Sequence, residues 1–260
     1  MVCVLSIDVG IKNLALCLLQ KTGATFTVMS WKWYNVTDFA QSNPTTRAVS
    51  KKTVGVSGGT CVAKLRKGAK VCGKKGNATA SGRVLCGTHD PAKKHKPEDT
   101  QQWCWSLQSA LPEIAKDMGL ADIPPSDLMV AIEQQTVQNR KMLLQAHVIY
   151  GFFVQFFANK VPVKFIPAYN KLQVYDGPEV QCTLKTPYAR RKFMGRKHTE
   201  CMLSGAEHAE WLDYFRQCKN KQDDIADAFL QGLYVLFGRS KSSASEPGAG
   251  VVRRRRRVKF

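Results

Sequence analysis

Four acidic side chains stand at the ends of apolar or amphipathic segments, where they could hold divalent metal ions. Asp8 and Glu133 each end a short apolar segment. Asp224 and Asp227 open the last amphipathic segment, and their spacing of three residues places both on one face of a helix. Mg²⁺ and Mn²⁺ prefer oxygen ligands, and a pair of such ions can hydrolyse a phosphodiester. The pattern therefore predicts metal-dependent cleavage of a nucleic-acid backbone.

Each of these residues also has an ordinary structural role open to it. Asp8 lies two residues before Gly10 and could belong to a turn. Glu133 could cap or flank a helix, and Asp224 suits the preference of helix N-termini for negative charge. The occurrence of all four in this order, each at the end of an element, favours a shared site over four separate structural roles.

A sheet would have to bring these side chains together, and the apolar segments supply its strands. Three apolar segments open the chain in immediate succession, which predicts an antiparallel meander. The expected strands cover residues 2–7, 14–20, 25–33, 128–132 and 161–166, and the expected helices cover residues 100–118, 137–158 and 223–237. This order predicts an α/β fold of the ribonuclease-H type, a mixed sheet flanked by helices.

The stretch between the third strand and the first helix has a different composition. Residues 38–99 are rich in Gly, Ser, Thr and Lys and poor in large apolar side chains, so they cannot fold by burying a core. We predict one nuclease domain at residues 1–240 with an insertion at about residues 38–99. Residues 241–260 are expected to form a flexible linker and a basic tail that contains Arg253–Arg257.

The insertion contains four residues that could bind Zn²⁺ tetrahedrally: Cys61, Cys72, Cys86 and His89. Cys86 and His89 have the short gap typical of such sites, whereas the gap between Cys61 and Cys72 is wider than usual. Metal binding would explain how a segment without a core becomes ordered. The alternative is a basic loop with incidental cysteines. Lysines and arginines around the cysteines could contact phosphates: Lys64, Arg66, Lys67, Lys70, Lys74 and Lys75.

The charge of the chain favours a polyanionic partner. Lys and Arg total 39 against 20 Asp and Glu, a formal net charge of +19, although a membrane surface or RNA would attract the same charge. Charge runs are usually solvated faces, but Tyr188 and Phe193 lie within the run before the last helix and favour nucleic acid. The candidate DNA contacts are Lys12, Lys185, Arg190, Arg191, Lys192, Arg196 and Lys197.

The sequence also predicts the setting in which the protein works. The longest apolar run, residues 148–157, is far shorter than the roughly 20 residues that span a bilayer, so we expect no membrane association. The chain has 9 cysteines, an odd number that cannot all pair in disulfides, and several stand alone in apolar segments. Both features favour a reducing intracellular compartment. The pattern does not choose among nucleus, mitochondrion and viral factory.

Three motifs together resemble those of RuvC-like Holliday junction resolvases. They are SIDVGIKNLA at residues 6–15, IEQQ at residues 132–135 with Asn139-Arg140 beyond it, and DIADAF at residues 224–229. The resemblance is greatest to the branch found in poxviruses and other large DNA viruses, and to the related fungal mitochondrial enzymes. It covers roughly residues 2–20, 128–158 and 220–237.

This resemblance implies a function and a set of site residues. Asp8, Glu133, Asp224 and Asp227 would be the catalytic ligands of Mg²⁺ or Mn²⁺. The substrate would be branched DNA in recombination and repair, and the protein would be a homodimer whose subunits nick opposed strands, leaving 5′-phosphate and 3′-hydroxyl ends. The long second helix would contribute to the dimer contact. The insertion between Asp8 and Glu133 departs from the family's compact pattern.

Two other functions stay open at the level of sequence. One is a transposon-type RuvC nuclease, but its zinc ribbon is expected between the glutamate and the last aspartate, whereas these cysteines precede Glu133. The other is a non-catalytic nucleic-acid-binding zinc protein on a ribonuclease-H-like scaffold. The presence of all four expected carboxylates argues against that second alternative.

Overall fold

The computed structural model describes residues 2–36, 57–64, 70–78, 83–86, 88–89 and 100–238. The chain divides into two compact units. The core unit comprises Met1–Ala40 and Cys104–Phe260, and the Cys/His unit comprises Gln41–Trp103. The linker and basic tail predicted at residues 241–260 lie outside the described residues.

A five-stranded mixed sheet forms the centre of the core unit, with the strand order β3-β2-β1-β7-β8. The strands are β1 (Val2–Val9), β2 (Asn13–Thr22), β3 (Thr25–Asn35), β7 (Leu128–Gln134) and β8 (Val163–Pro167). The first three are antiparallel neighbours, and β7 and β8 run parallel to β1. This strand order confirms the mixed sheet of the ribonuclease-H type that the sequence predicts.

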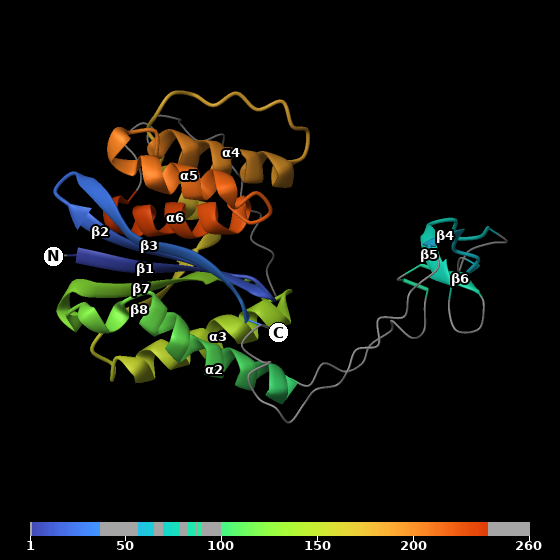
Figure 1. Ribbon diagram of the computed structural model, residues 1–260, viewed down its shortest axis with the longest axis horizontal. Helices are drawn as coiled ribbons and strands as arrows, with labels where there is room; N and C mark the ends of the chain where they lie inside the picture. Colours follow the sequence, from blue (N-terminus) through green and yellow to red (C-terminus); the bar gives the residue numbers. More distant parts are fainter. Residues whose placement is uncertain are drawn as a thin grey trace, which may run out of the picture. The chain divides into compact units, whose positions relative to one another are not determined.

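Helices cover both faces of this sheet (Figure 1). One face carries α2 (Thr100–Asp117) and α3 (Arg140–Phe156), and the other carries α4 (Pro187–Met202), α5 (Ala209–Gln217) and α6 (Gln222–Phe237). Each parallel strand is reached through a helical crossover, as parallel pairing requires. No helix in the described ranges combines the length and apolar character needed to cross a bilayer.

The helices predicted from periodicity are present, but one begins later than expected. The predicted segment 137–158 starts as a helix only at Arg140, because the Asn139 side chain accepts a hydrogen bond from the Met142 backbone N–H at 3.3 Å and caps the first turn. The basic stretch before the last helix contains α4, which Thr186 caps in the same way and which Pro187 opens. The sequence pattern predicts no helix in that stretch, so α4 is an element that the pattern does not reveal.

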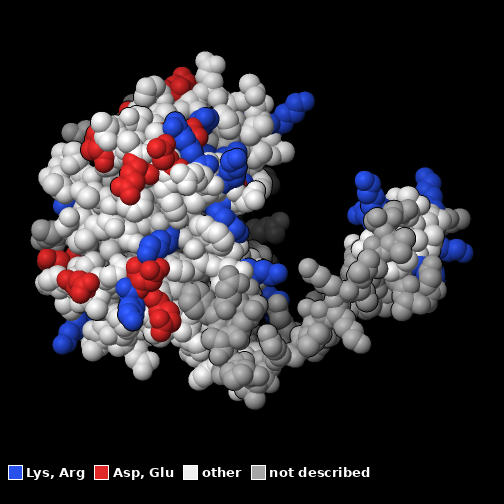
Figure 2. Space-filling view, in the orientation of Figure 1, with Lys and Arg blue, Asp and Glu red and all other residues white. Residues whose placement is uncertain are grey.

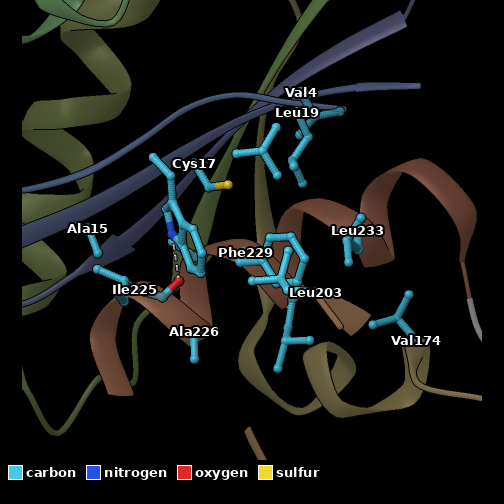
Figure 3. Packing of buried hydrophobic residues seen from close by; sticks show 14 of the residues in the cluster. Val4, Ala15, Cys17, Leu19, Val174, Leu203, Ile225, Ala226, Phe229 and Leu233 are labelled. Carbon is cyan, nitrogen blue, oxygen red and sulfur yellow. Dashed lines mark hydrogen bonds between the residues drawn. The ribbon is translucent and has the colours of Figure 1, made fainter. Parts of the chain in front are cut away.

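The α6 helix is buried along most of its length against β1 and β2 (Figure 3). The Trp31 indole N–H donates to the backbone oxygen of Ile225 at 3.0 Å, and the Trp31 ring packs on Phe229. Gly232 permits this close packing, since a Cβ atom there would lie 2.7 Å from the Leu19 side chain. These contacts fix the start of α6 relative to the ends of the strands.

A buried glutamine ties α6 to the two central strands. The Gln231 side-chain nitrogen donates to the Ser6 hydroxyl at 3.0 Å in β1 and to the Ala131 carbonyl at 3.2 Å in β7. A buried amide held on both sides in this way resists sliding of the helix, since movement would leave polar groups unpaired. The acidic residues at the start of α6 are therefore positioned over the β1–β7 pair.

The Cys/His unit contains a three-stranded antiparallel sheet of β4 (Ser57–Thr60), β5 (Lys75–Ala78) and β6 (Val84–Leu85). Its buried apolar cluster consists of Cys61, Leu85 and Cys86, with two partly buried neighbours. So small a cluster buries too little apolar surface to offset the entropy of ordering the chain. Another source of stability is therefore needed within this unit.

Candidate functional site

Three of the four predicted carboxylates meet at one edge of the sheet of the core unit. The parallel register sets Ile7 of β1 opposite Ile132 of β7, so that Asp8 and Glu133 are the next neighbours along the pair. Asp227 joins them from the second turn of α6. One oxygen atom of each of these carboxylates lies within 4.8 Å of the others.

The fourth predicted carboxylate, Asp224, is not one of the three that share this distance. It lies one turn before Asp227 on α6, with its side chain 39% exposed and 3.9 Å from the Lys221 ammonium. Its neighbour Asp223, which is not one of the four predicted ligands, forms ion pairs with Lys192 at 2.8 Å and with Arg196 at 3.5 Å. The two adjacent aspartates thus have different surroundings.

Lys171 lies among the carboxylates and was not identified from the sequence. It comes from the short helix η6 (Ala168–Val174) that directly follows β8. Its ammonium contacts Glu133 at 3.0 Å and also forms an ion pair with Asp227. Because the side chain is 14% exposed, these carboxylates and the ammonium form a partly desolvated cluster with strong mutual interactions.

The pKa values in this cluster differ in direction. Burial, and then the charges of Glu133 and Asp227, raise the pKa of Asp8 well above its usual range. Burial opposes ionisation of Glu133 too, but the charge of Lys171 and a hydrogen bond from Gln135 at 2.9 Å lower its pKa. Glu133 is therefore ionised, whereas the negative charges of Glu133 and Asp227 oppose ionisation of Asp8. A positive charge in addition to that of Lys171 would favour the carboxylate form of Asp8.

The donor set suits a hard divalent cation. Carboxylate oxygens are the ligands that Mg²⁺ and Mn²⁺ prefer, and these three converge from a strand pair and a helix that are rigidly packed. The ammonium of Lys171 already satisfies part of the demand for positive charge. Asp8, Glu133 and Asp227 are accordingly the residues that would hold a metal ion here.

Substituting Lys171 with methionine tests whether the carboxylates need this charge. We expect Lys171→Met to destabilise the metal-free protein by about 3 kcal/mol at neutral pH, because the variant leaves carboxylates close together without a counter-charge. Added Mg²⁺ should recover more stability in the variant than in the unsubstituted protein. Urea denaturation with and without Mg²⁺ measures both effects.

The control for this experiment is Lys164→Met, which removes an exposed lysine of the same length from β8. It should change the free energy of unfolding by no more than about 0.5 kcal/mol, as exposed positions usually do. Equal stability of Lys171→Met and the unsubstituted protein without metal would contradict the interpretation of the cluster.

A groove runs beside the carboxylates within the core unit. Its lining includes Glu133, Lys171, Asp227, Tyr188, Arg191 and Lys192. Tyr188 is 62% exposed, and the Lys192 ammonium lies 5.2 Å from the centre of its ring. The groove therefore combines acidic ligands at one part of its wall with cationic and aromatic groups that suit phosphates and bases.

The predicted DNA contacts fall into different environments. Lys12 is exposed in the loop that follows Asp8, and Lys185, Arg190 and Arg191 are also exposed. Lys197 is paired with Glu200 at 2.6 Å. Arg191 and Lys192 are the two predicted contacts that line the groove.

The four predicted zinc ligands converge in the Cys/His unit. Cys61, Cys72, Cys86 and His89 each place a ligand atom within 4.8 Å of the others. A backbone bridge between Lys64 and Val71 closes a hairpin whose two sides carry Cys61 and Cys72, which explains their wide spacing in the sequence.

The distances within this cluster match a tetrahedral zinc site. The sulfur atoms of Cys72 and Cys86 lie 3.8 Å apart, and Nδ1 of His89 lies 3.4 Å from the Cys86 sulfur and 3.5 Å from the Cys61 sulfur. Zinc bonds of about 2.3 Å to sulfur and about 2.0 Å to nitrogen place tetrahedral ligand atoms roughly 3.5–3.8 Å apart. The cluster has the size of a zinc coordination shell.

The chemistry of Cys86 agrees with metal binding. Burial works to raise the pKa of its thiol, but the backbone N–H groups of Thr88 and His89, followed by the Cys61 and Cys72 thiols, lower it to about 6. The thiolate is the form that binds metals. The nine cysteines include no disulfide among the described residues, so the ligand sulfurs are free for coordination.

Comparisons with known proteins give limited matches. No protein-family model matches the chain. An uncharacterized protein, L451 of Acanthamoeba polyphaga mimivirus, is 26% identical over 205 residues, which cover 66% of this chain and 48% of that protein. The chain thus spans about half the length of this curated relative.

Solved structures with similarity to the chain include two complexes with DNA. The complex of fowlpox virus resolvase with its Holliday junction substrate has a TM-score of 0.43 at 15% identity, covering 90% of this chain and 96% of that one. RuvC of T. thermophilus with a Holliday junction substrate has a TM-score of 0.43 at 14% identity, covering 91% and 94%. The fold assignment rests on the strand order of the sheet.

Proposed function

We propose that the chain is a structure-selective endonuclease that resolves four-way (Holliday) and branched DNA junctions by paired, metal-dependent hydrolysis of phosphodiesters. The observation that carries this proposal is the convergence of Asp8, Glu133 and Asp227 at one edge of a ribonuclease-H-type sheet, with oxygen atoms within 4.8 Å of one another. Such convergence of carboxylates is costly unless a bound cation offsets it.

The catalytic ions of the proposal are Mg²⁺ or Mn²⁺. When bound, such ions activate the attacking water and stabilise the departing oxygen. The three carboxylates would bind the positively charged ions. Gln135 and Lys171 donate hydrogen bonds to the two oxygens of Glu133, at 2.9 Å and 3.0 Å, and so fix the orientation of this carboxylate. Asp224 remains the proposed fourth ligand by resemblance.

The groove supplies contacts for the DNA. Arg191 and Lys192 line it together with the carboxylates, so a phosphate held by these cations would be next to the metal ligands. The exposed ring of Tyr188 offers a surface for a base that has left the stack, which branch points provide more readily than uniform duplex. Preference for a four-way junction rests on the motif resemblance together with this groove.

Paired cutting requires two active sites, so the proposal includes a homodimer. Helix α3 exposes Leu144 at 39% and Phe156 at 41%, and the Phe152 and Phe156 rings stack at 5.4 Å. Apolar side chains on one helix are suited to a self-complementary contact between two copies. The mimivirus relative agrees with an origin among large DNA viruses. The proposed role in recombination and repair, inside the cell, follows from the proposed substrate.

We also propose that Zn²⁺ occupies the Cys/His cluster in a structural role. Three sulfurs and one nitrogen close a tetrahedral shell, and a closed shell leaves no position for substrate. Because the apolar cluster of this unit is small, binding of the metal would supply the free energy that stabilises the folded unit.

Cleavage of an end-labelled four-way junction in Mg²⁺ tests the proposed activity. A linear duplex, a single strand and an RNA–DNA hybrid of the same sequence serve as the other substrates. We expect symmetric nicks in the junction alone, with ends that a ligase can reseal. Preferential cutting of another substrate would replace the junction with that substrate. No cutting by folded, zinc-replete protein in Mg²⁺ or Mn²⁺ would overturn the nuclease proposal in favour of a binding protein.

A further inference from the structure

The part of the Cys/His unit that carries the metal ligands has a one-sided positive charge. No Asp or Glu occurs from Ala40 to His89, so no carboxylate within that stretch can neutralise its cations. Figure 2 shows lysine and arginine side chains, and no acidic ones, on the drawn face of the described part of the unit. The exposed cationic residues of this part are Lys64, Lys70, Lys74, Lys75 and Arg83.

These cations are held on ordered backbone next to the metal ligands. The Lys74 carbonyl accepts a hydrogen bond from the Cys61 N–H at 2.7 Å, and Lys75 pairs with Thr60 between β5 and β4. Lys64 is bridged to Val71 across the hairpin. A surface anchored in this way loses less conformational entropy on binding than a disordered basic segment would.

The composition of the unit indicates which polyanion it suits. No Phe, Tyr or Trp occurs from Ala40 to His89, so this stretch offers no aromatic platform on which single-stranded bases could stack. Between residues 57 and 89 the described part of the unit contains strands but no helix that could read base edges from the major groove. A cationic surface that has neither aromatic side chains for stacking nor a recognition helix is suited to binding the phosphates of a DNA duplex, independently of base sequence.

We propose that the Cys/His unit is a second DNA-binding element, an arm that grips duplex phosphates independently of the groove in the core unit. This inference rests on the proposed function for its substrate, since a branched DNA presents duplex segments beyond the point of cutting. The metal folds the arm, and the lysines on its hairpin make the contacts. A site with three thiolates and one zinc ion has only a small net charge, so the arm remains strongly cationic.

The test compares two double variants that remove the same charge. Lys74→Gln/Lys75→Gln alters the arm. Lys116→Gln/Lys160→Gln alters two exposed lysines of the core unit, one in the last turn of α2 and one shortly before β8, and neither lines the groove. Binding of full-length protein to a four-way junction is measured at several salt concentrations, with Ca²⁺ in place of Mg²⁺ to prevent cutting. Zinc content of each variant reports whether the arm is folded.

We expect the arm variant to bind more weakly and the slope of log K against log salt to fall in magnitude by about 2, roughly 0.9 for each lost phosphate contact. The control variant should leave the slope unchanged, and a linear duplex should show the same contrast as the junction. A second arm variant, Lys64→Gln/Lys70→Gln, should reproduce the effect.

Unchanged slopes in both zinc-replete arm variants would overturn the proposal, as would an equal loss in the control. Either result would leave the arm free for another partner, such as an acidic protein surface. Cutting of the junction is measured separately in Mg²⁺, so failure of the nuclease proposal cannot be mistaken for failure of the arm.

Discussion

Replacing Glu133 with glutamine is expected to abolish junction cutting while junction binding stays intact or becomes tighter. The side chain keeps its size but loses the charge that the metal site requires, and one negative charge near the DNA phosphates is removed. Loss of several kcal/mol of transition-state stabilisation lowers the rate on the order of 10³-fold. Asp8→Asn should have an effect of the same size. Single-turnover cleavage at saturating protein measures the rate.

The matched control is Asp213→Asn on α5, where the carboxylate is 70% exposed and 3.8 Å from Arg216. It removes the same charge from an exposed position outside the three clustered residues and should leave cutting unchanged. Because Glu133→Gln also deprives Lys171 of a partner, urea denaturation should accompany the assay. A folded Glu133→Gln protein that still cuts at the unsubstituted rate would remove this residue from the catalytic set.

Asp224 and Asp227 of α6 distinguish the ligand set that the resemblance implies from the set that the structure brings together. Asp227 shares the cluster with Glu133, whereas Asp224 lies one turn earlier and outside the shared distance. We therefore expect Asp227→Asn to match Glu133→Gln, and Asp224→Asn to slow cutting less, with recovery at raised Mg²⁺. Equal and complete loss in both variants would show that the resemblance had identified the fourth ligand correctly.

The main elements of the core unit follow from the sequence because each leaves a local signal. Uninterrupted apolar runs mark the buried strands, and the acidic residues at their ends mark the edge of the sheet. The β1–β7 register then makes Asp8 and Glu133 neighbours. Local pattern and tertiary arrangement agree at these positions, as they do in sequences that specify one fold.

Lys171 could not be found in the same way. It is one lysine among many in a basic chain, and its position after a strand carries no periodic signal. Its role arises from η6, which brings the ammonium back to Glu133 and Asp227. Helix α4 was missed for a related reason: its buried residues are Gly195, His198 and Thr199, not a stripe of large apolar side chains.

Substituting Cys86 with serine is expected to eliminate bound zinc and to unfold the Cys/His unit while the core unit stays folded. The buried cluster of the Cys/His unit is little more than the ligands themselves, so its order depends on the metal, whose binding to such sites contributes about 10–16 kcal/mol near neutral pH. The core unit has its own extensive buried cluster around α6. Zinc content should fall from about one ion per chain to none.

Limited digestion with trypsin locates the loss of structure. Cleavage at the lysines between Cys61 and Cys86 should accelerate many-fold in Cys86→Ser and in chelator-treated protein, while the core unit resists. Cys201→Ser, which alters an exposed cysteine outside the cluster, should keep both its zinc and its resistance. If Cys86→Ser unfolded the core unit as well, the two units would not be independent in stability. Zinc-free unsubstituted protein that resisted trypsin equally would show that the hairpin is ordered without metal, and the convergence of the three cysteines and His89 would then need an explanation other than coordination.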